Sequence, residues 1–394
     1  MMLHDAEFLS ALLAWLAGLA AIASLALALC GALLVRRFYA REPELCASLP
    51  AVTVLKPLCG DEPRLEAALA SICAQHYPQF QIVFGVQDAA DPALACVRRL
   101  RARFPACDIT VIVDAEIHGP NRKVSNLINM LPAARHQLLV FSDSDLHVAD
   151  DYLERLVTAL AVPGTGLVTT LCSGLPTASG LGAALGVMHI THSFLPGALL
   201  SRALGRQDCL GTTMALRRDT LSRIGGLGGL AVHLAEDNVL GQRVRGLGLN
   251  IALADTVPAT AVSEPSLAAL WQHELRWART IRTLEPCGFA ASTLQYPLFW
   301  CLLALTLSGA ADWSAILLGV AWAVRAGCAI KIDRAVSSRQ PLPLWLLPLR
   351  DLMSVAEIVV SFLGARVVWR GHIMQARPAA RLKVLAELEP EGMV

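Results

Sequence analysis

The sequence predicts an α/β fold, in which a central sheet carries helices on both faces and membrane-length helices flank it at either end. Between residues 50 and 290, short apolar runs that fit buried strands alternate with longer segments of helical periodicity. Near each end, apolar residues continue for longer than a core helix needs. Of the 394 residues, 55% are hydrophobic and 16% are charged, which is apolar for a wholly water-soluble protein.

The first membrane segment is the uncharged run at residues 8–35. It exceeds the ~20 residues that a helix needs to cross a bilayer. Arg36, Arg37 and Arg41 follow it, so by the positive-inside rule we expect residues 1–36 to be a transmembrane helix that leads into a cytoplasmic domain. A cleaved signal peptide is disfavoured, because the run is long and basic residues follow rather than precede it.

Two further apolar runs, at residues 296–311 and 313–330, indicate a hairpin of two spans broken at Ala311 and Asp312. Basic residues follow them on the expected cytoplasmic side, namely Lys331, Arg334 and Arg339.

A weaker apolar region at residues 342–369 carries Arg350, Asp351 and Glu357. It fits either a third span with paired charges or an interfacial helix, and we favour the interfacial helix. The sequence thus predicts a transmembrane and interfacial region at 291–372. A basic cytoplasmic tail is expected at 373–394, with Arg377, Arg381 and Lys383.

Residues 37–290 form the expected cytoplasmic domain. Its alternating strands and helices predict parallel strands with helices on both faces. The expected strands are 52–55, 81–86, 109–113, 137–141 and 168–171, and the expected helices are 65–75, 92–104, 123–131 and 150–160. An apolar, small-residue segment at 180–204 is interrupted and is expected to lie in the membrane interface, where it would place His192 beside the lipid.

Carboxylates follow two of the expected strands. Asp88 comes after 81–86, and Asp143 and Asp145 come after 137–141. Ligands of such sheets bind outside the carboxyl ends of the strands. Asp143 and Asp145 could share one Mg²⁺ or Mn²⁺ ion bound to a diphosphate, although Asp is also common in strand-end turns.

Two helix starts add further candidates. Lys123 and Asn126, in GPNRKVSNL, could form a diphosphate or ribose cradle, or Lys123 could be merely solvated. Glu236 and Asp237 open another helix, where either one could act as a general base or simply favour the helix dipole. We favour Asp237 slightly as the base.

The last candidates lie on an amphipathic helix at 267–282. Arg276 could neutralise a leaving diphosphate, and Trp277 could pack on a donor or acceptor ring. An interfacial Arg and Trp would be the ordinary alternative.

Several classes of protein lose support. The net charge of +1 gives no field for nucleic acid. The chain has no G-x-S-x-G, Walker A or G-x-G-x-x-G motif. Its eleven cysteines form no C-x-x-C pair, so a disulfide framework or a zinc site is not expected.

As an ordered set, these motifs resemble family 2-like glycosyltransferases of the GT-A fold, and more closely the ceramide glucosyltransferase family, family 21. The matching segments include VLKPLCG at 54–60, VQDAADPA at 86–93, GPNRKVSNL at 119–127, DSDL at 143–146, AEDN and ELRW. The resemblance implies a GT-A-type, Rossmann-like mixed sheet. It also implies direct inverting transfer from a UDP-sugar to a lipid.

The same resemblance implies roles for the site residues. Asp88 would contact the nucleotide, Asp143 and Asp145 would bind the metal diphosphate, and Asp237 would be the base. Arg276 and Trp277 would close the site, with His192 and His273 on the acceptor side. His273 stands where Gln or Arg is usual, so its role is open.

Within the family, HELRWARTIR followed by Pro286 and Gly288 is most similar to bacterial hopanoid-associated glycosyltransferases. This implies UDP-N-acetylglucosamine as donor, a hopanoid such as bacteriohopanetetrol as acceptor, and the bacterial inner membrane as location. Ceramide with UDP-glucose is the close alternative. A processive polysaccharide synthase would need more spans, and a membrane receptor or transporter would not need the carboxylate series.

Overall fold

The computed structural model describes residues 2–41, 48–336, 343–369, 372–376 and 382–387. They form two compact units, each assembled from separate stretches of the chain. Unit 1 comprises residues 1–40, 178–204 and 264–365, and unit 2 comprises residues 41–177, 205–263 and 366–394. Three basic residues expected on the cytoplasmic side lie outside the described residues, namely Arg339, Arg377 and Arg381.

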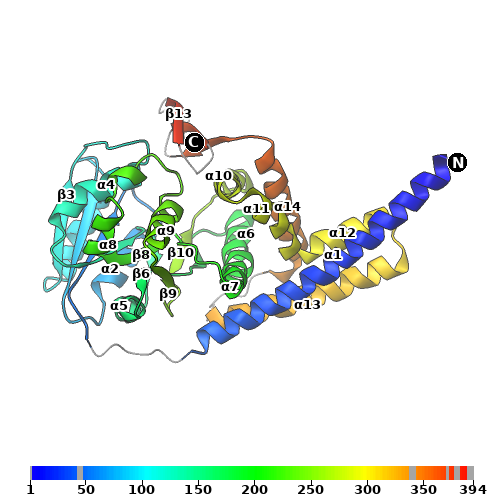
Figure 1. The fold of residues 1–394 in the computed structure, drawn as a ribbon, viewed down its shortest axis with the longest axis horizontal. Coiled ribbons are helices and arrows are strands. Elements are labelled where there is room, and N and C mark those ends of the chain that lie inside the picture. Colours follow the sequence, from blue (N-terminus) through cyan, green and yellow to red (C-terminus); the bar gives the residue numbers. More distant parts are fainter. Residues whose placement is uncertain (1, 42–47, 337–342, 370–371, 377–381, 388–394) are drawn as a thin grey trace. The chain divides into compact units, whose positions relative to one another are not determined.

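A seven-stranded mixed sheet forms the centre of unit 2, in the order β3-β2-β1-β4-β8-β6-β9 (Figure 1). Strands β1 to β4 run parallel, and so do β6 and β9, whereas β8 pairs antiparallel with both β4 and β6. The predicted mixed α/β sheet is therefore confirmed. The strands are β1 (Val52–Pro57), β2 (Phe80–Val86), β3 (Asp108–Val113), β4 (Leu138–Ser142), β6 (Thr165–Thr169), β8 (Thr213–Arg217) and β9 (Asn250–Leu253).

Helices cover both faces of this sheet. Neighbouring strand residues point to opposite faces, so Val54 and Val140 pack in one core cluster while Leu55 and Leu139 pack in the other. The first cluster is completed by α2 (Leu65–Cys73), α3 (Ala93–Arg103) and α5 (Tyr152–Ala161). The second is completed by α4 (Arg122–Met130), α8 (Arg218–Arg223) and α9 (Glu236–Gly246).

Helix α4 approaches β2 closely at Gly85. A Cβ atom there would lie 2.4 Å from Met130 Sδ and 2.5 Å from Asn126 Oδ1, so no larger residue fits without a shift. Asn126 is buried and donates from Nδ2 to the Gly85 carbonyl at 2.8 Å. This close packing fixes α4 on the sheet and holds Lys123, in its first turn, near the carboxyl ends of the strands.

Two small sheets complete unit 2. In one, β5 (Leu146–His147) and β7 (Ser173–Pro176) flank β10 (Ala259–Val262), which pairs Thr260 with Leu146 directly after the D-x-D segment. The other consists of β11 (Arg366–Trp369), β12 (His372–Ala376) and β13 (Leu382–Glu387), so part of the expected tail forms strands.

Unit 1 is helical and holds the membrane candidates (Figure 1). Within the described residues, three helical stretches are long and apolar enough to cross a bilayer, or up to four if a bent pair counts as one span. The three are Asp5–Tyr39 within α1 (Met2–Tyr39), Leu181–Ala203, and α13 (Asp312–Val336). The first confirms the expected N-terminal membrane-length helix.

The segment at 180–204 is less interrupted than we expected. It forms α6 (Leu181–His189), a π-helical turn η2 (Ile190–Phe194) and α7 (Leu195–Ala203) without a gap. Pro196 lacks a backbone N–H and would disturb an α-helical ladder, and the π turn lies directly before it. The helix is thus continuous and long enough to be a span.

The expected hairpin at 296–330 is only partly as predicted. α12 (Pro297–Leu307) and α13 are joined by a tight turn in which Gly309 and Ala310 have φ values of 64° and 60°. With 11 residues, however, α12 is only about 16 Å long and cannot cross a bilayer alone. It follows α11 (Pro286–Ala291) and η4 (Ser292–Gln295) at a bend of 76°. A span in this region would therefore have to include the bent segment before α12.

The weaker apolar region contains α14 (Leu347–Phe362), a helix of 16 residues whose charges are buried and paired. Arg350 has no exposed surface and donates to Glu274 of α10 (Leu267–Leu284) at 2.8 Å and to Glu357 at 3.1 Å. Asp351 accepts from the Leu298 N–H at 3.1 Å. The charges are paired, as a third span would require, and they join α14 to α10 and α12.

We predict that Arg350→Met destabilises the protein by about 3–5 kcal/mol, because it leaves two buried carboxylates without a cation. Thermal unfolding of the detergent-solubilised chain measures this as a lower melting temperature. The triple variant Arg350→Met, Glu274→Gln, Glu357→Gln should recover part of the loss. Arg98→Met, on the exposed side of α3, is the control, and an unchanged melting temperature for Arg350→Met would contradict the argument.

Candidate functional site

The candidate donor residues of unit 2 gather at the carboxyl edge of the parallel strands. Strands β1, β2 and β4 are adjacent and parallel, so their ends meet at one edge. Asp88 follows β2, is exposed, and accepts from the Ala90 N–H at 2.8 Å in a local turn. Asp143 and Asp145 follow β4 at the same edge.

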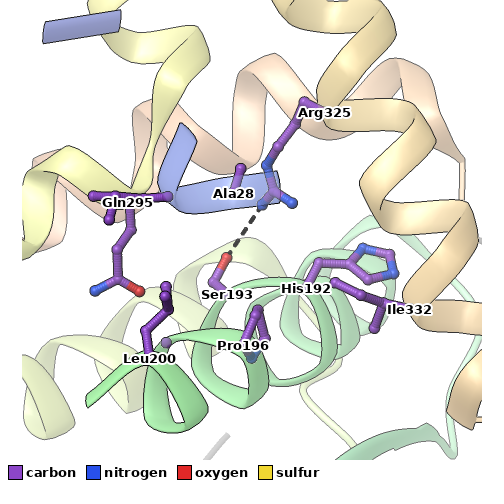
Figure 2. A pocket seen from close by; sticks show the side chains of 10 residues that line it. Ala28, His192, Ser193, Pro196, Leu200, Gln295, Arg325 and Ile332 are labelled. Atoms are coloured by element: carbon purple, nitrogen blue, oxygen red, sulfur yellow. Dashed lines mark hydrogen bonds between the residues drawn. The ribbon is translucent and has the colours of Figure 1, made fainter. Parts of the chain in front are cut away.

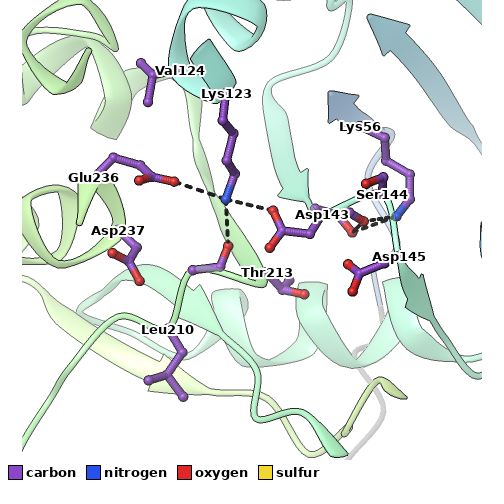
Figure 3. Close-up of polar contacts among 12 residues, drawn as sticks. Lys56, Lys123, Val124, Asp143, Ser144, Asp145, Leu210, Thr213, Glu236 and Asp237 are labelled. Atoms are coloured by element: carbon purple, nitrogen blue, oxygen red, sulfur yellow. Dashed lines mark hydrogen bonds and ion pairs between the residues drawn. The ribbon is translucent and has the colours of Figure 1, made fainter. Parts of the chain in front are cut away.

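Lys123 joins Asp143 to Glu236, the first residue of α9 (Figure 3). Its Nζ lies 2.7 Å from Asp143 Oδ1, 3.0 Å from Glu236 Oε1 and 3.2 Å from the Gly211 carbonyl. Burial would lower the pKa of Lys123, but attraction by Asp143 and then Glu236 raises it above its usual value. Because an ammonium group has three N–H donors, this one is fully occupied by protein acceptors.

Asp145 has different partners from Asp143. Its carboxylate accepts a hydrogen bond from the Thr260 hydroxyl of β10. Burial, followed by the negative charge of Asp143, raises the pKa of Asp145. The two carboxylates therefore repel each other, and a cation between them would relieve that repulsion.

Lys56 is a site residue that the sequence reasoning missed. It is fully buried in β1 and donates to Ser142 Oγ at 3.1 Å and to the Asp143 carbonyl. Burial lowers the pKa of Lys56 to about 8, against the opposing attraction of Asp145 and Asp143. The available signal was a lysine inside VTVLKP, a run that otherwise fits a buried strand.

Glu236 is held on both carboxylate oxygens. Besides Lys123 on Oε1, its Oε2 accepts from Asn121 Nδ2 at 3.1 Å. Asn121 also caps α4 by accepting from the Val124 N–H at 3.1 Å. Asn121, in the GPNRKVSNL segment but not singled out from the sequence, thus links the starts of α4 and α9.

Asp237 is less engaged than its neighbour. Its Oδ1 accepts from the Asn238 N–H at 2.8 Å, and its Oδ2 faces Gly211, where an added Cβ would lie only 2.8 Å away. Removal from water, followed by the negative charge of Glu236, raises the pKa of Asp237 to about 7. A carboxylate with such a pKa is suited to accept a proton near neutral pH.

The acceptor-side candidates belong to unit 1. His192 is buried in the π turn, and its Nε2 lies 2.7 Å from Asp333 Oδ1. Figure 2 shows it lining a cavity of about 20 Å³, enough for roughly one water molecule. Ser193, Gln295 and Arg325 supply further polar atoms to this cavity.

His273, Arg276 and Trp277 lie on successive turns of α10. The His273 Nδ1 is hydrogen-bonded to Glu264, and its ring meets the Trp277 ring edge-on at 4.3 Å. These residues form a group within unit 1, and the donor candidates form a group within unit 2.

The D-x-D carboxylates fit a divalent cation. Mg²⁺ and Mn²⁺ prefer oxygen ligands, and the mutual repulsion of Asp143 and Asp145 is what such an ion would compensate. Unit 1 has another group at metal-ligand spacing, made of His189, Glu274 and Glu357. There the Arg350 guanidinium already donates hydrogen bonds to both carboxylates.

The comparison with known structures supports the fold. The structure of mannosyltransferase PcManGT from Pyrobaculum calidifontis, in complex with GDP-Man and Mn²⁺, has a TM-score of 0.50 at 20% identity. The match covers 88% of this chain and 99% of that one. The likeness confirms the expected GT-A-type fold.

Sequence comparison finds ceramide glucosyltransferases. Ceramide glucosyltransferase 1 of Caenorhabditis elegans is 26% identical over 254 residues, which is 64% of this chain and 54% of that protein. Ceramide glucosyltransferase 3 of the same organism is 22% identical over 249 residues, 63% and 54% of the two chains. The matched region is thus about half the length of these relatives.

The family comparison covers nearly the whole chain. The model described as "Glycosyl transferase family 21" matches residues 13–382. This range includes the strand-end carboxylates, both buried lysines and the helix that carries Arg276 and Trp277. The resemblance seen in the motifs is therefore confirmed, and the chain belongs to glycosyl transferase family 21.

Proposed function

We propose that this protein is an inverting glycosyltransferase that moves a sugar from a UDP-sugar to the hydroxyl group of a membrane lipid. The observation that carries the proposal is the cluster in unit 2, where Asp143, Lys123 and Glu236 are ion-paired beside Asp145 and Asp237. Membership of family 21 supports the reaction class and argues against a receptor or a transporter.

The donor side of the proposal uses the strand ends. Asp88 would accept hydrogen bonds from the nucleotide, since it is the exposed carboxylate after β2. Asp143 and Asp145 would hold Mg²⁺ or Mn²⁺, which when bound would supply positive charge to the diphosphate. Lys56 would hold the main chain of Asp143, as its hydrogen bond to that carbonyl indicates. For Asn126, which the sequence offered as part of the donor cradle, we propose a packing role, because it is buried and donates to the Gly85 carbonyl.

The base in this proposal is Asp237. Both carboxylate oxygens of Glu236 already have partners, Lys123 and Asn121. Asp237 would take the proton of the lipid hydroxyl as the hydroxyl oxygen attacks the anomeric carbon of the sugar. The bond from that carbon to the diphosphate oxygen breaks, UDP leaves with the electron pair, and the configuration inverts. Arg276 would stabilise the charge that develops on the leaving group.

The acceptor side of the proposal uses unit 1, which contains the candidate spans. Trp277 would contact the lipid. His192, which the sequence placed beside the lipid, is buried against Asp333 of α13, and we assign it a packing role instead of a lipid contact. The HELRWARTIR segment with Pro286 and Gly288 supports a hopanoid such as bacteriohopanetetrol with UDP-N-acetylglucosamine as donor. The similarity to ceramide glucosyltransferases supports ceramide with UDP-glucose as the second candidate. The location would be the bacterial inner membrane, with unit 2 in the cytoplasm.

We predict that the purified full chain forms a lipid carrying one sugar when it is given a UDP-sugar and its lipid acceptor. Mass spectrometry of the lipids would compare bacteriohopanetetrol with UDP-N-acetylglucosamine against ceramide with UDP-glucose. EDTA should abolish the product, and excess Mg²⁺ or Mn²⁺ should restore it. The double variant Asp143→Asn, Asp145→Asn should form no product when either metal is added. A polymer as product, or hydrolysis of UDP-sugar alone with every acceptor, would refute lipid transfer.

We predict that Asp237→Asn lowers kcat by about 10²- to 10⁴-fold, the usual contribution of a general base. UDP-sugar binding, measured by calorimetry, should stay within a few-fold of the wild-type value. Glu236→Gln is the matched control on the adjacent residue, and its loss of kcat should be at least about tenfold smaller. The assignment fails if Asp237→Asn keeps full activity or if Glu236→Gln is the more damaging change.

We predict that kcat/KM falls about tenfold per pH unit below pH 7, because only ionised Asp237 accepts the proton. Since the pKa of Asp237 is raised to about 7, activity is present above that pH and lost as pH falls through it. An unperturbed aspartate would lose activity only near pH 4. The residual rate of Asp237→Asn should not show this step, and a wild-type rate that stays constant down to pH 5 would contradict the prediction.

A further inference from the structure

Within unit 1, the indole of Trp277 lies beside two imidazole rings. The His273 ring, one helical turn earlier on α10, meets it at a centroid distance of 4.3 Å and an interplanar angle of 61°. The His189 ring of α6 lies 6.4 Å away at 27°. Aromatic pairs at such distances have preferred geometries, so the two rings restrict the orientation of the indole.

His273 is itself fixed. Its Nδ1 is hydrogen-bonded to Glu264, which precedes α10 in the chain, and the Glu264 side chain is only 14% exposed. Between them, Ser266 caps the helix by accepting from the Ala269 N–H at 3.2 Å. The His273 ring is therefore tied to the segment that leads into its own helix.

The backbone that carries these rings is anchored as well. Glu274, next to His273, is buried and paired with Arg350 of α14. Leu270 and Leu275 are buried on the same helix. With the helix held in place, the orientation of the Trp277 side chain depends on the rings that touch it.

We propose that His273, anchored by Glu264, is a positioning residue that orients the Trp277 indole for contact with the lipid acceptor. The contact with the acceptor rests on the function proposed above. A Gln or Arg at position 273 could bond to Glu264 but would present no aromatic ring to the indole. The histidine thus supplies two separate properties, a hydrogen bond through Nδ1 and a ring against Trp277.

Two substitutions separate these properties. His273→Gln keeps a hydrogen-bonding group and removes the ring, whereas His273→Phe keeps a ring and removes the hydrogen bond. Because the proposed role acts through the ring, His273→Phe should behave like the wild type more closely than His273→Gln does. His76→Gln, at an imidazole that is 79% exposed in unit 2, is the matched surface control and should change nothing.

The first measurement needs no substrate. The full chain would be labelled with 5-fluorotryptophan and studied by ¹⁹F NMR, with the Trp277 line assigned by its loss in Trp277→Phe. One sharp line is expected for the wild type, and His273→Phe, which keeps a ring but loses the bond to Glu264, should keep one line that is broadened. His273→Gln should split the line or move it towards the chemical shift of free 5-fluorotryptophan. Glu264→Gln should broaden the line. An unchanged Trp277 line in His273→Gln overturns the positioning role.

The second measurement uses the active enzyme. His273→Gln should raise the KM for the lipid acceptor about three- to tenfold, the size expected for loss of one aromatic contact. The KM for the UDP-sugar and kcat should stay within about twofold, and His273→Phe should restore the acceptor KM. A change confined to the donor KM overturns the role. A chain that shows the NMR change but transfers no sugar keeps the positioning of Trp277 and refutes the proposed function instead.

Discussion

The buried ammonium group of Lys123 is the interaction on which the site in unit 2 depends. It bonds to Asp143 at the end of β4 and to Glu236 at the start of α9, while its own backbone opens α4. Three separate elements, α4, β4 and α9, therefore meet at one charge. Burying an unpaired ammonium or carboxylate would be costly, so the pairing offsets the cost of burying each of these charges.

This ion pairing also explains why two adjacent acidic residues have different properties. Glu236 has Lys123 and Asn121 as partners, whereas Asp237 accepts from the Asn238 N–H and lies against Gly211. The charge on Glu236 then raises the pKa of Asp237. Around the strand ends, carboxylates outnumber the two buried lysines, Lys56 and Lys123. The repulsion between Asp143 and Asp145 is what a divalent cation would relieve, in agreement with the fit of the D-x-D pair to Mg²⁺ or Mn²⁺.

Local periodicity was sufficient to predict much of the fold. The strands before Asp88 and Asp143 were correct because buried parallel strands are short apolar runs, and their shared edge follows from parallel pairing. The partners of these residues could not be predicted in the same way. Thr260 reaches Asp145 from a strand 115 positions later, and Asn121 reaches Glu236 over the same separation. The bend before α12 also escaped prediction, since hydropathy reports how apolar a segment is and not its direction. The Glu264 partner of His273 follows from the chain's path into α10, which a motif alone does not contain.

The central claim is that Asp143 and Asp145 hold a metal-bound nucleotide diphosphate at the carboxyl edge of the sheet. Its most direct test is a structure of the full chain with UDP and Mn²⁺, in which anomalous scattering locates the manganese. We expect the manganese signal at the Asp143 and Asp145 carboxylates, with the diphosphate bound to it and the nucleotide extending towards Asp88. A manganese signal elsewhere in unit 2, or UDP bound away from this edge of the sheet, would contradict the account.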